Sequence, residues 1–439
     1  MKYTNVSYGC QMNVHESEKI AGILEELGYT PAGSIEESDI IVFNTCCIRD
    51  TAEKRAFGNI GAVKPIKKKN KDLIVAVVGC MTEQKGYDKI FKEKYPYVDI
   101  VLGTGNLNLL KEKIIEKREQ GKKTYLTQSC NDPIDETVPQ SRTSFPNAWV
   151  NIMYGCNNFC TYCIVPYVRG RERSREPEEI LKEVRNLVEG GYKEITLLGQ
   201  NVNSYGHDFS DRPEVNFANL LKAVSEIPGK FRIRFMTSHP KDLTEEVVDV
   251  IASSDKIMNN IHLPVQAGSD AVLKKMNRKY DRAHYLALID MIKAKLPGVG
   301  ITTDIMVGFP TETEEDFSDT LDLVRKVRYS NAFTFIYSVR KGTVAATMPQ
   351  IDYQTKRRRI TELIALQNEI TKELSEEYIG NVYEVLIEDV NKKYKNAVCG
   401  RTESGRLVSC VGDPSLIGTF QNILITEARS ASLFGKIVE

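Results

Sequence analysis

Apolar runs and helical spacings alternate along the first part of the chain, residues 1–125. The runs at 4–9, 39–45 and 73–79 predict three buried strands, and a stretch with helical spacing follows each one. The first of these helices is predicted over 14–28, with Gly28 as its C-terminal stop. Such alternation is typical of a parallel sheet with helices on its faces. We therefore expect an N-terminal α/β domain.

The same alternation continues over residues 142–372. Six strands are predicted at 149–153, 193–199, 231–238, 260–265, 300–309 and 332–338, and helical stretches such as 177–191 and 281–296 lie between them. About six such units predict an open or partial (β/α) barrel.

A helix over 356–378 then leads to the last part of the chain, residues 375–439. The apolar residues of this helix recur at roughly helical spacing: Ile360, Leu363, Ile364, Ile370 and Leu374. Short apolar runs at 382–390, 396–402, 405–412 and 420–429 are separated by turn residues, which predicts a small β-barrel.

Composition narrows the class of protein. The chain has 439 residues, of which 41% are hydrophobic, enough for sizeable cores. Lys plus Arg equals Asp plus Glu at 59 each, so a polyanionic partner would have to bind a local patch. The longest aliphatic run is too short to cross a bilayer and no apolar signal core begins the chain, so we expect a cytoplasmic protein. In that compartment the ten cysteines favour metal ligation, catalysis or burial over disulfides.

Three cysteines lie within eight residues after the first barrel strand, at Cys156, Cys160 and Cys163. A structural zinc ion needs four ligands, no histidine lies between them, and the nearest upstream cysteine is Cys130. A cubane iron–sulfur cluster held by three thiolates keeps one iron open for a chelating ligand. The alternative is three incidental buried cysteines, which packing does not explain at this density.

Three further cysteines, Cys10, Cys46 and Cys80, each follow a predicted strand of the first domain. The carboxyl ends of parallel strands meet at one edge of a sheet, so the three are expected there together. Their spacing alone leaves open either a second metal site or three separately buried thiols.

The motifs resemble those of a known family. Cys156-x3-Cys160-x2-Cys163, with Tyr162 before the last cysteine, resembles the signature of radical S-adenosylmethionine (SAM) enzymes. The segments "YGCQMNVHESE", "FNTCCIRDTAEKRA" and "VVGCMTEQ" resemble the N-terminal domain of the methylthiotransferases, and "LLGQNVNSYG", "HLPVQAGSD" and "TTDIMVGFPTETEEDF" resemble their barrel. The segment "GRTESGRLV" resembles the TRAM domain, an RNA-binding β-barrel.

This resemblance implies two 4Fe-4S clusters and SAM as cofactors. Cys156, Cys160 and Cys163 would hold the radical SAM cluster, and Cys10, Cys46 and Cys80 the auxiliary cluster. Cys47 would be extra and, on strand-like backbone, should point away from Cys46. A radical generated from SAM would remove a hydrogen from the substrate, and the auxiliary cluster would supply the methylated sulfur.

Other site residues are implied less directly. Tyr162, Gln200 and Asn201 would contact SAM. The alternatives are that Gln200 and Asn201 cap the next turn and that Tyr162 is an exposed loop aromatic. Four arginines beside the cluster loop suit phosphate recognition, and we expect them to bind RNA: Arg169, Arg171, Arg173 and Arg175. Weaker candidates are His262, Asp304 and Arg340, and Val339 and Val344 stand where the family usually carries prolines.

"CQMN" and "RGRERSR" most resemble the branch that methylthiolates isopentenylated adenosine 37 of tRNA, so the expected substrate is a tRNA anticodon stem-loop. Expected further partners are a flavodoxin- or ferredoxin-type electron donor and a sulfur donor, with no membrane and a monomeric chain. Three alternatives stay open: the ribosomal-protein aspartate branch, the threonylcarbamoyl-adenosine tRNA branch, and an iron–sulfur RNA-binding protein without catalysis.

Overall fold

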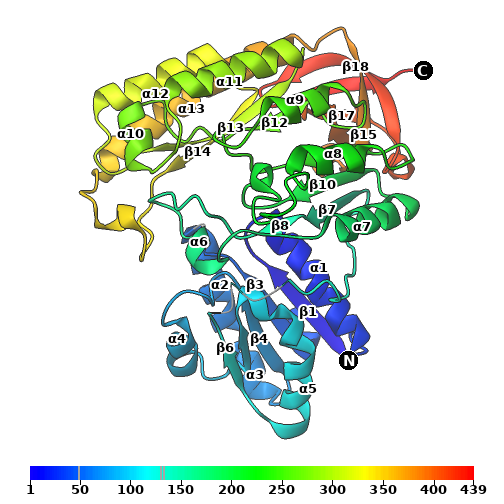
Figure 1. The fold of residues 1–439 in the computed structure, drawn as a ribbon. Helices are drawn as coiled ribbons and strands as arrows, with labels where there is room; N and C mark the ends of the chain where they lie inside the picture. The colour runs from blue at the N-terminus through cyan, green and yellow to red at the C-terminus, as the bar shows by residue number, and fades with distance from the viewer. Residues whose placement is uncertain (48–49, 129–130, 132–133) are drawn as a thin grey trace. The chain divides into compact units, whose positions relative to one another are not determined.

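The computed structural model describes residues 1–47, 50–128, 131 and 134–439 (Figure 1). The chain forms two compact units. We call Met1–Thr143, Met153–Phe159 and Cys163–Arg175 the N-terminal unit, and Ser144–Ile152, Cys160–Tyr162 and Glu176–Glu439 the C-terminal unit. No helix within the described residues is long and apolar enough to cross a membrane.

A six-stranded sheet forms the centre of the N-terminal unit, and every neighbouring pair of its strands is parallel, as predicted. The strand order is β2-β1-β3-β4-β5-β6. The strands are β1 (Lys2–Ser7), β2 (Thr30–Pro31), β3 (Ile40–Thr45), β4 (Ile74–Gly79), β5 (Ile100–Leu102) and β6 (Thr124–Leu126).

Both faces of this sheet are buried under helices. On β4, Val75 and Val77 belong to one apolar cluster, whereas Ile74, Ala76 and Val78 belong to the other. Because side chains alternate along a strand, a strand covered on both faces is expected to be apolar at nearly every position. The helices are α1 (Gln11–Glu26), α2 (Asp50–Ala62), α3 (Lys64–Lys69), α4 (Tyr87–Lys94) and α5 (Leu110–Gln120), with 3-10 turns η1 (Ile35–Glu37) and η2 (Thr104–Leu109).

Glycines mark the end of one predicted helix and the start of another. After α1, Gly28 adopts φ +79 and its N–H bonds to the carbonyl of Glu25, which confirms the predicted stop. The stretch with helical spacing that follows the third predicted strand, residues 82–94, is helical only in α4, which begins at Tyr87 after Gly86 at φ +86. The residues between Cys80 and Gly86 form turns instead.

The C-terminal unit begins with six strands in two parallel three-stranded sheets, ordered β11-β10-β7 and β12-β13-β14. A parallel bridge between Ile233 of β11 and Ile257, which precedes β12, links the two sheets. These strands are β7 (Asn147–Asn151), β10 (Glu194–Leu198), β11 (Arg232–Phe235), β12 (Asn260–His262), β13 (Gly300–Val307) and β14 (Asn331–Ile336). The arrangement confirms the predicted open (β/α) barrel.

Helices connect the barrel strands, and several begin with a capping side chain. Thr313 and Asp316 form a reciprocal capping box at the start of α12. The helices of the barrel are α7 (Pro177–Glu189), α8 (Phe217–Ser225), α9 (Glu245–Ala252), α10 (Asp270–Lys275), α11 (Arg282–Lys295) and α12 (Glu314–Val327), with 3-10 turns η3 (Val202–Ser204) and η4 (Val344–Thr347).

Helix α13 (Tyr353–Glu376) packs against the barrel with a more polar inner face than the sequence predicts. Leu363 and Ile370 are buried as expected, but Ile364 is exposed. Gln367 is buried instead and donates to the carbonyl of Tyr329 at 2.8 Å. The hydroxyl of Ser375 likewise donates to the carbonyl of Ser430 at 2.7 Å. Hydrogen bonds to strand ends thus replace part of the expected apolar stripe.

A closed five-stranded barrel ends the chain, in the order β15-β16-β17-β19-β18. Its strands are β15 (Val382–Val390), β16 (Ala397–Arg401), β17 (Leu407–Val411), β18 (Phe420–Arg429) and β19 (Ser432–Ile437), with a 3-10 turn η5 (Pro414–Leu416). The small barrel is as predicted, but the strand β19 was missed. It closes the barrel by pairing parallel to β17 and antiparallel to β18.

Candidate iron–sulfur and nucleotide-binding site

The loop that carries Cys156 is fixed by backbone contacts within the N-terminal unit. The short strands β8 (Met153–Tyr154) and β9 (Arg173–Ser174) pair, and the N–H of Cys156 bonds to the carbonyl of Gly170 at 3.1 Å. Gly155 has φ +77, and a Cβ there would lie 1.9 Å from the carbonyl oxygen of Arg171. Only glycine allows this approach. The amide of Asn158 lies 3.5 Å from the Sγ of Cys156.

Cys160, Thr161 and Tyr162 contact the barrel of the C-terminal unit. The N–H of Thr161 bonds to the carbonyl of Met276 at 3.0 Å. The Nη1 of Arg278 donates to the Sγ of Cys160 at 3.4 Å. The ring of Tyr162 lies edge-on to Phe309, which follows β13, with centroids 6.5 Å apart. The middle of the cysteine loop therefore lies beside the carboxyl end of a barrel strand.

Cys10, Cys46 and Cys80 follow β1, β3 and β4, which are neighbours in the N-terminal sheet. Cys46 and Cys80 are buried, and Cys10 is half-buried. Two glycines let the turns approach one another. A Cβ on Gly9 would lie 2.5 Å from the Cβ of Cys46, and one on Gly79 would lie 2.5 Å from the carbonyl oxygen of Thr45. The three cysteines thus end adjacent strands at one edge.

A buried arginine lies beside these thiols. Arg169 is 2% exposed and donates to Glu16 at 2.7 Å and to the side-chain oxygen of Asn13 at 3.0 Å. Burial raises the pKa of the Cys10 thiol, and the positive charge of Arg169 opposes that rise. The pKa of the Cys80 thiol is raised by its hydrogen bond with Cys47 and by burial, and Arg169 again opposes the rise. This guanidinium therefore favours the thiolate forms that metals bind.

Cys47 does not lie apart from the other cysteines as the sequence suggested. It is buried, packs in the same apolar cluster as Cys46 and hydrogen-bonds with Cys80. The alternation of side chains fails here because strand β3 ends at Thr45, before either cysteine.

The four arginines expected to bind RNA fall into different environments. Arg169 is buried as described, and Arg175 is 6% exposed with two hydrogen bonds of 2.7 Å to Glu136. Arg171 is exposed and lies over the ring of Phe159, 4.4 Å from its centroid. Arg173 is half-buried and lines a small cavity of the N-terminal unit with Glu16. Burial corrects the RNA-binding expectation for Arg169 and Arg175, because a phosphate cannot reach them.

The residues expected to contact SAM lie after barrel strands. Gln200 and Asn201 follow β10 at its carboxyl end. The Nδ2 of Asn201 donates to Asp242 at 2.7 Å rather than capping η3, and its Oδ1 is buried with no hydrogen-bond partner among the described residues. A buried oxygen of this kind is suited to accept from a ligand.

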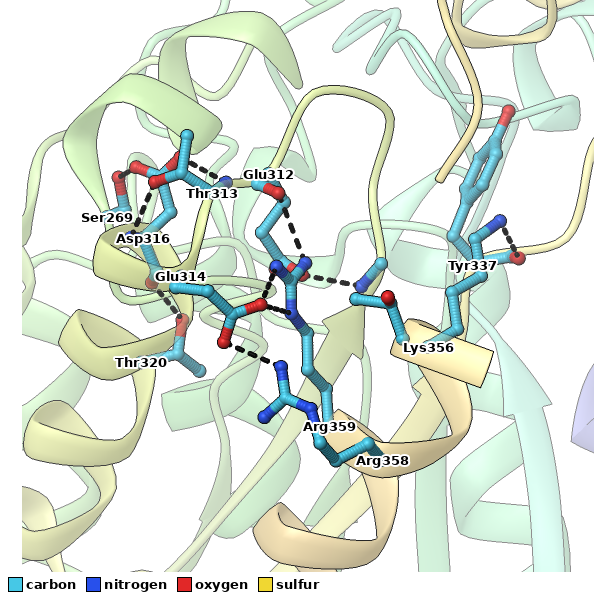
Figure 2. Close-up of polar contacts among 12 residues, drawn as sticks. Ser269, Glu312, Thr313, Glu314, Asp316, Thr320, Tyr337, Lys356, Arg358 and Arg359 are labelled. Carbon is cyan, nitrogen blue, oxygen red and sulfur yellow. Dashed lines mark hydrogen bonds and ion pairs between the residues drawn. The ribbon is translucent and has the colours of Figure 1, made fainter. Parts of the chain in front are cut away.

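The loop after β13 is anchored to helix α13 by charged groups, as Figure 2 shows. Glu312 is buried, accepts from the N–H of Gly308 at 2.7 Å and pairs with Arg359, also at 2.7 Å. Burial raises the pKa of the Glu312 carboxyl, although Gly308 and Arg359 oppose the rise. Because Phe309 lies in this loop, the pair positions the partner of the Tyr162 ring. Sequence reasoning missed both groups, which lie 47 residues apart.

A cavity of about 300 Å³ lies in the C-terminal unit between the barrel and the terminal β-barrel. His262 lines it, with its Nδ1 3.0 Å from the hydroxyl of Thr302 and its Nε2 3.7 Å from Asp304. Three arginines complete its basic lining: Arg234, Arg401 and Arg406. Arg340 lies outside this cavity lining, in the loop after β14, and Val339 and Val344 are exposed in the same region.

Comparison with known proteins identifies the family. A model of the radical SAM superfamily matches residues 150–324, one of the uncharacterized protein family UPF0004 matches 2–103, and one of the TRAM domain matches 376–438. A tRNA-2-methylthio-N(6)-dimethylallyladenosine synthase of Thermoanaerobacter pseudethanolicus is 51% identical over 99% of this chain and 92% of its own length. The synthase of that name from Clostridium botulinum is 51% identical over 98% and 95%.

This chain belongs to that synthase family. Its fold also resembles the radical SAM methyltransferase TsrM of Kitasatospora setae, solved with cobalamin and a 4Fe-4S cluster, with a TM-score of 0.59. The two are 13% identical, and the match covers 79% of this chain and 73% of TsrM. The likeness shows a shared radical SAM fold.

The donor groups present fit the two 4Fe-4S clusters that membership of this synthase family implies. Each set offers three cysteines, and a buried arginine lies beside each: Arg169 near Cys10 and Cys80, and Arg278 at Cys160. Thiolates buried with a cation are suited to iron. Across the described ranges, no three His, Cys, Asp or Glu side chains converge as ligands of one metal ion.

Proposed function

We propose that this chain converts N6-isopentenyladenosine at position 37 of tRNA to its 2-methylthio derivative by radical SAM chemistry. The observation that carries the proposal is the presence of two separate sets of three cysteines, each beside a buried arginine, in a chain of this synthase family. When bound, SAM and the two clusters would supply the radical that removes the C2 hydrogen and the methylated sulfur that replaces it.

We assign Cys156, Cys160 and Cys163 to the radical SAM cluster. Their loop follows the first barrel strand, as the radical SAM resemblance requires, and hydrogen bonds already reach two of the sulfurs. We assign Cys10, Cys46 and Cys80 to the auxiliary cluster, because they end three adjacent strands. Cys47 then acts as a neighbour that hydrogen-bonds with Cys80 and is no ligand in this assignment.

We propose that SAM binds against the carboxyl ends of the barrel strands, with Tyr162, Gln200 and Asn201 in contact. The orphaned Oδ1 of Asn201 supports an acceptor role toward the amino or hydroxyl groups of SAM. The Glu312–Arg359 pair would hold the loop of Phe309, so that Tyr162 keeps a fixed packing partner.

For the RNA, we propose two contact surfaces. The exposed guanidinium of Arg171 would bind a phosphate, and Arg173 remains a second candidate at the same loop. The terminal β-barrel would bind the stem-loop through a local face, since the chain has no net charge to attract RNA over its whole surface. An anticodon loop offers the unstacked bases that such chemistry needs.

We propose three domains, with limits at 1–125, 142–372 and 375–439. The family matches at 2–103, 150–324 and 376–438 support these limits.

The reaction also needs external donors. Cleavage of SAM consumes one electron, and every modified tRNA keeps one sulfur atom, so we propose an external flavodoxin- or ferredoxin-type electron donor and an external sulfur donor. We propose that the protein acts in the cytoplasm as a monomer, because a single chain carries both cysteine sets.

Mass spectrometry of tRNA nucleosides tests the proposal. Deletion of the gene is expected to remove the 2-methylthio group from isopentenyladenosine, and the intact gene, but not Cys156→Ala or Cys80→Ala, is expected to restore it. Unchanged isopentenyladenosine derivatives, together with loss of methylthio-threonylcarbamoyl-adenosine or of a ribosomal methylthio-aspartate, would assign the chain to another branch. Restoration by both cysteine variants would indicate a non-catalytic RNA-binding role.

A further inference from the structure

Arg278 is buried in the C-terminal unit with all three of its guanidinium nitrogens hydrogen-bonded. Its Nε donates to the hydroxyl of Tyr280 at 2.9 Å, its Nη2 to the carbonyl of Pro264 at 2.9 Å and its Nη1 to the Sγ of Cys160 at 3.4 Å. The Tyr280 hydroxyl in turn donates to the carbonyl of Val265 at 2.8 Å, which orients its lone pair toward Arg278. The guanidinium is therefore held in one orientation.

The turn that presents Arg278 is equally fixed. Asn277, two residues after the end of α10, takes the left-handed conformation at φ +60, and the N–H of Arg278 bonds to the carbonyl of Leu273 at 2.9 Å. The preceding Met276 carbonyl accepts from the N–H of Thr161. The backbone beside Cys160 and the backbone beside Arg278 are thus joined next to their side-chain contact.

The counter-charge of Arg278 differs from that of most other buried arginines. Arg169 pairs with Glu16, Arg359 with Glu312 and Arg232 with Glu384. Arg406, which is also buried, donates to the carbonyl of Ser330 instead. Within the ranges that the structure describes, no carboxylate pairs with Arg278, whose three acceptors are a phenol, a carbonyl and a thiol. A buried cation needs a negative partner. Cys160 is the acceptor here that becomes negative when it binds iron.

We propose that Arg278 sets the reduction potential of the cluster held by Cys160, acting as a positioning residue through an N–H···S hydrogen bond and a fixed positive charge. The inference rests on the proposed function, in which Cys160 is a cluster ligand. Adding one electron from the external donor makes the cluster more negative. A cation and a hydrogen bond at a ligand sulfur stabilise that reduced form more than the oxidised form and so raise the potential.

The test is a redox titration, followed by electron paramagnetic resonance, of the anaerobically reconstituted full-length chain. Cys10, Cys46 and Cys80 are first changed to Ala, so that one cluster is titrated. In this background Arg278→Met is expected to lower the ratio of reduced to oxidised cluster at a fixed potential about tenfold, a shift of about 59 mV for one electron. Arg278→Lys keeps the positive charge but not the forked guanidinium. Its cluster is expected to have a reduction potential between that of the Arg278→Met variant and that of the chain with Arg278 intact.

Arg232→Met is the matched control, because this buried arginine of the same unit contacts no cysteine in the described structure. It is expected to leave the potential unchanged. A wild-type potential in Arg278→Met would overturn the inference. If that variant does not assemble a cluster, Arg278→Lys decides, and an unchanged or higher potential there would overturn it as well. A background chain that binds no iron at all would instead contradict the proposed function.

Discussion

At the scale of single residues, the arginines of the cysteine loop show how burial changes the role of a side chain. Arg169 and Arg171 lie two positions apart, yet one is buried against Glu16 and the other is exposed over Phe159. Removing one partner of a buried ion pair leaves the other uncompensated, which costs about 3–5 kcal/mol. An exposed guanidinium has no such structural role and remains free to bind a phosphate.

We therefore predict opposite outcomes for two substitutions. Arg169→Met is expected to lower the iron content from about eight to about four per chain, because the thiols of Cys10 and Cys80 lose the charge that favours their thiolates. Arg171→Ala, the matched control, is expected to keep all its iron but to weaken tRNA binding and reduce its salt slope by about one. Iron analysis and binding at several salt concentrations check both. Full iron content in Arg169→Met would refute the role given to that residue.

The sequence singles out these cysteines because their signal is local. Each follows an apolar strand, and Cys156, Cys160 and Cys163 share one short spacing. The partners of the cysteines are not local. Arg278 comes 118 residues after Cys160, and Arg169 comes 153 after Glu16. No periodicity links such pairs, so the sequence could suggest an arginine near the site but not which one is buried.

At the scale of elements, helix α13 fixes a loop of the barrel. Arg359 pairs with Glu312 and also with Glu314 at the start of α12. Lys356, one turn earlier, lies over the ring of Tyr337, 5.1 Å from its centroid, and burial lowers the pKa of its amine (Figure 2). The Cγ of Lys356 also fills the space beside Gly308, where a Cβ would lie 2.4 Å from it. The helix thus packs directly on the loop after β13.

We predict that Arg359→Met destabilises the protein in a pH-dependent way. The pKa of Glu312 is already raised by burial and would rise further without Arg359. A raised carboxyl pKa contributes stability at low pH that is lost as the pH rises through the folded-state value. The fall in melting temperature relative to the wild type should therefore be larger at about pH 7 than at about pH 5, where an ordinary Glu begins to protonate.

Thermal unfolding at both pH values checks this prediction, and Arg358→Met is the control. Arg358 pairs with Glu314 and Glu362 at the exposed surface, where ion pairs contribute about 0–1 kcal/mol. It should change the melting temperature little at either pH. An equal loss of stability at both pH values in Arg359→Met would show that packing, rather than the charge of Glu312, dominates.

At the scale of the whole molecule, the terminal β-barrel is tied to the first residues of several strands of the C-terminal unit. Arg232 begins β11 and donates to the carbonyls of Arg401 and Glu384. The amide of Asn260, at the start of β12, donates to the carbonyl of Ser404 at 3.0 Å. Arg406 in turn donates to the carbonyl of Ser330 before β14. The terminal β-barrel is therefore structurally part of the (β/α) barrel that it contacts, although its sequence marks a separate domain.

We predict that a chain ending at Glu376 will be markedly less stable than the full-length protein, because the buried Arg232 would lose the carbonyls of Arg401 and Glu384 and the carboxylate of Glu384. Thermal unfolding and limited proteolysis check this. Lys230→Ala in the full-length chain removes an exposed pair with Glu384 and a contact with the ring of Phe420, and it should lower the melting temperature far less. A truncated chain that melts at the full-length temperature would show that the barrel is an independent appendage.

Helix α13 is tied down at both ends, by Arg359 to Glu312 and by Ser375 to the carbonyl of Ser430. Each residue of an α-helix advances its face by about 100°. One inserted residue between these two points would therefore turn either the guanidinium or the hydroxyl away from its acceptor, whereas seven residues would nearly restore the phase but lengthen the rod. The number of residues between these two anchors is therefore fixed, and the length of the helix is as constrained as any side chain in the site.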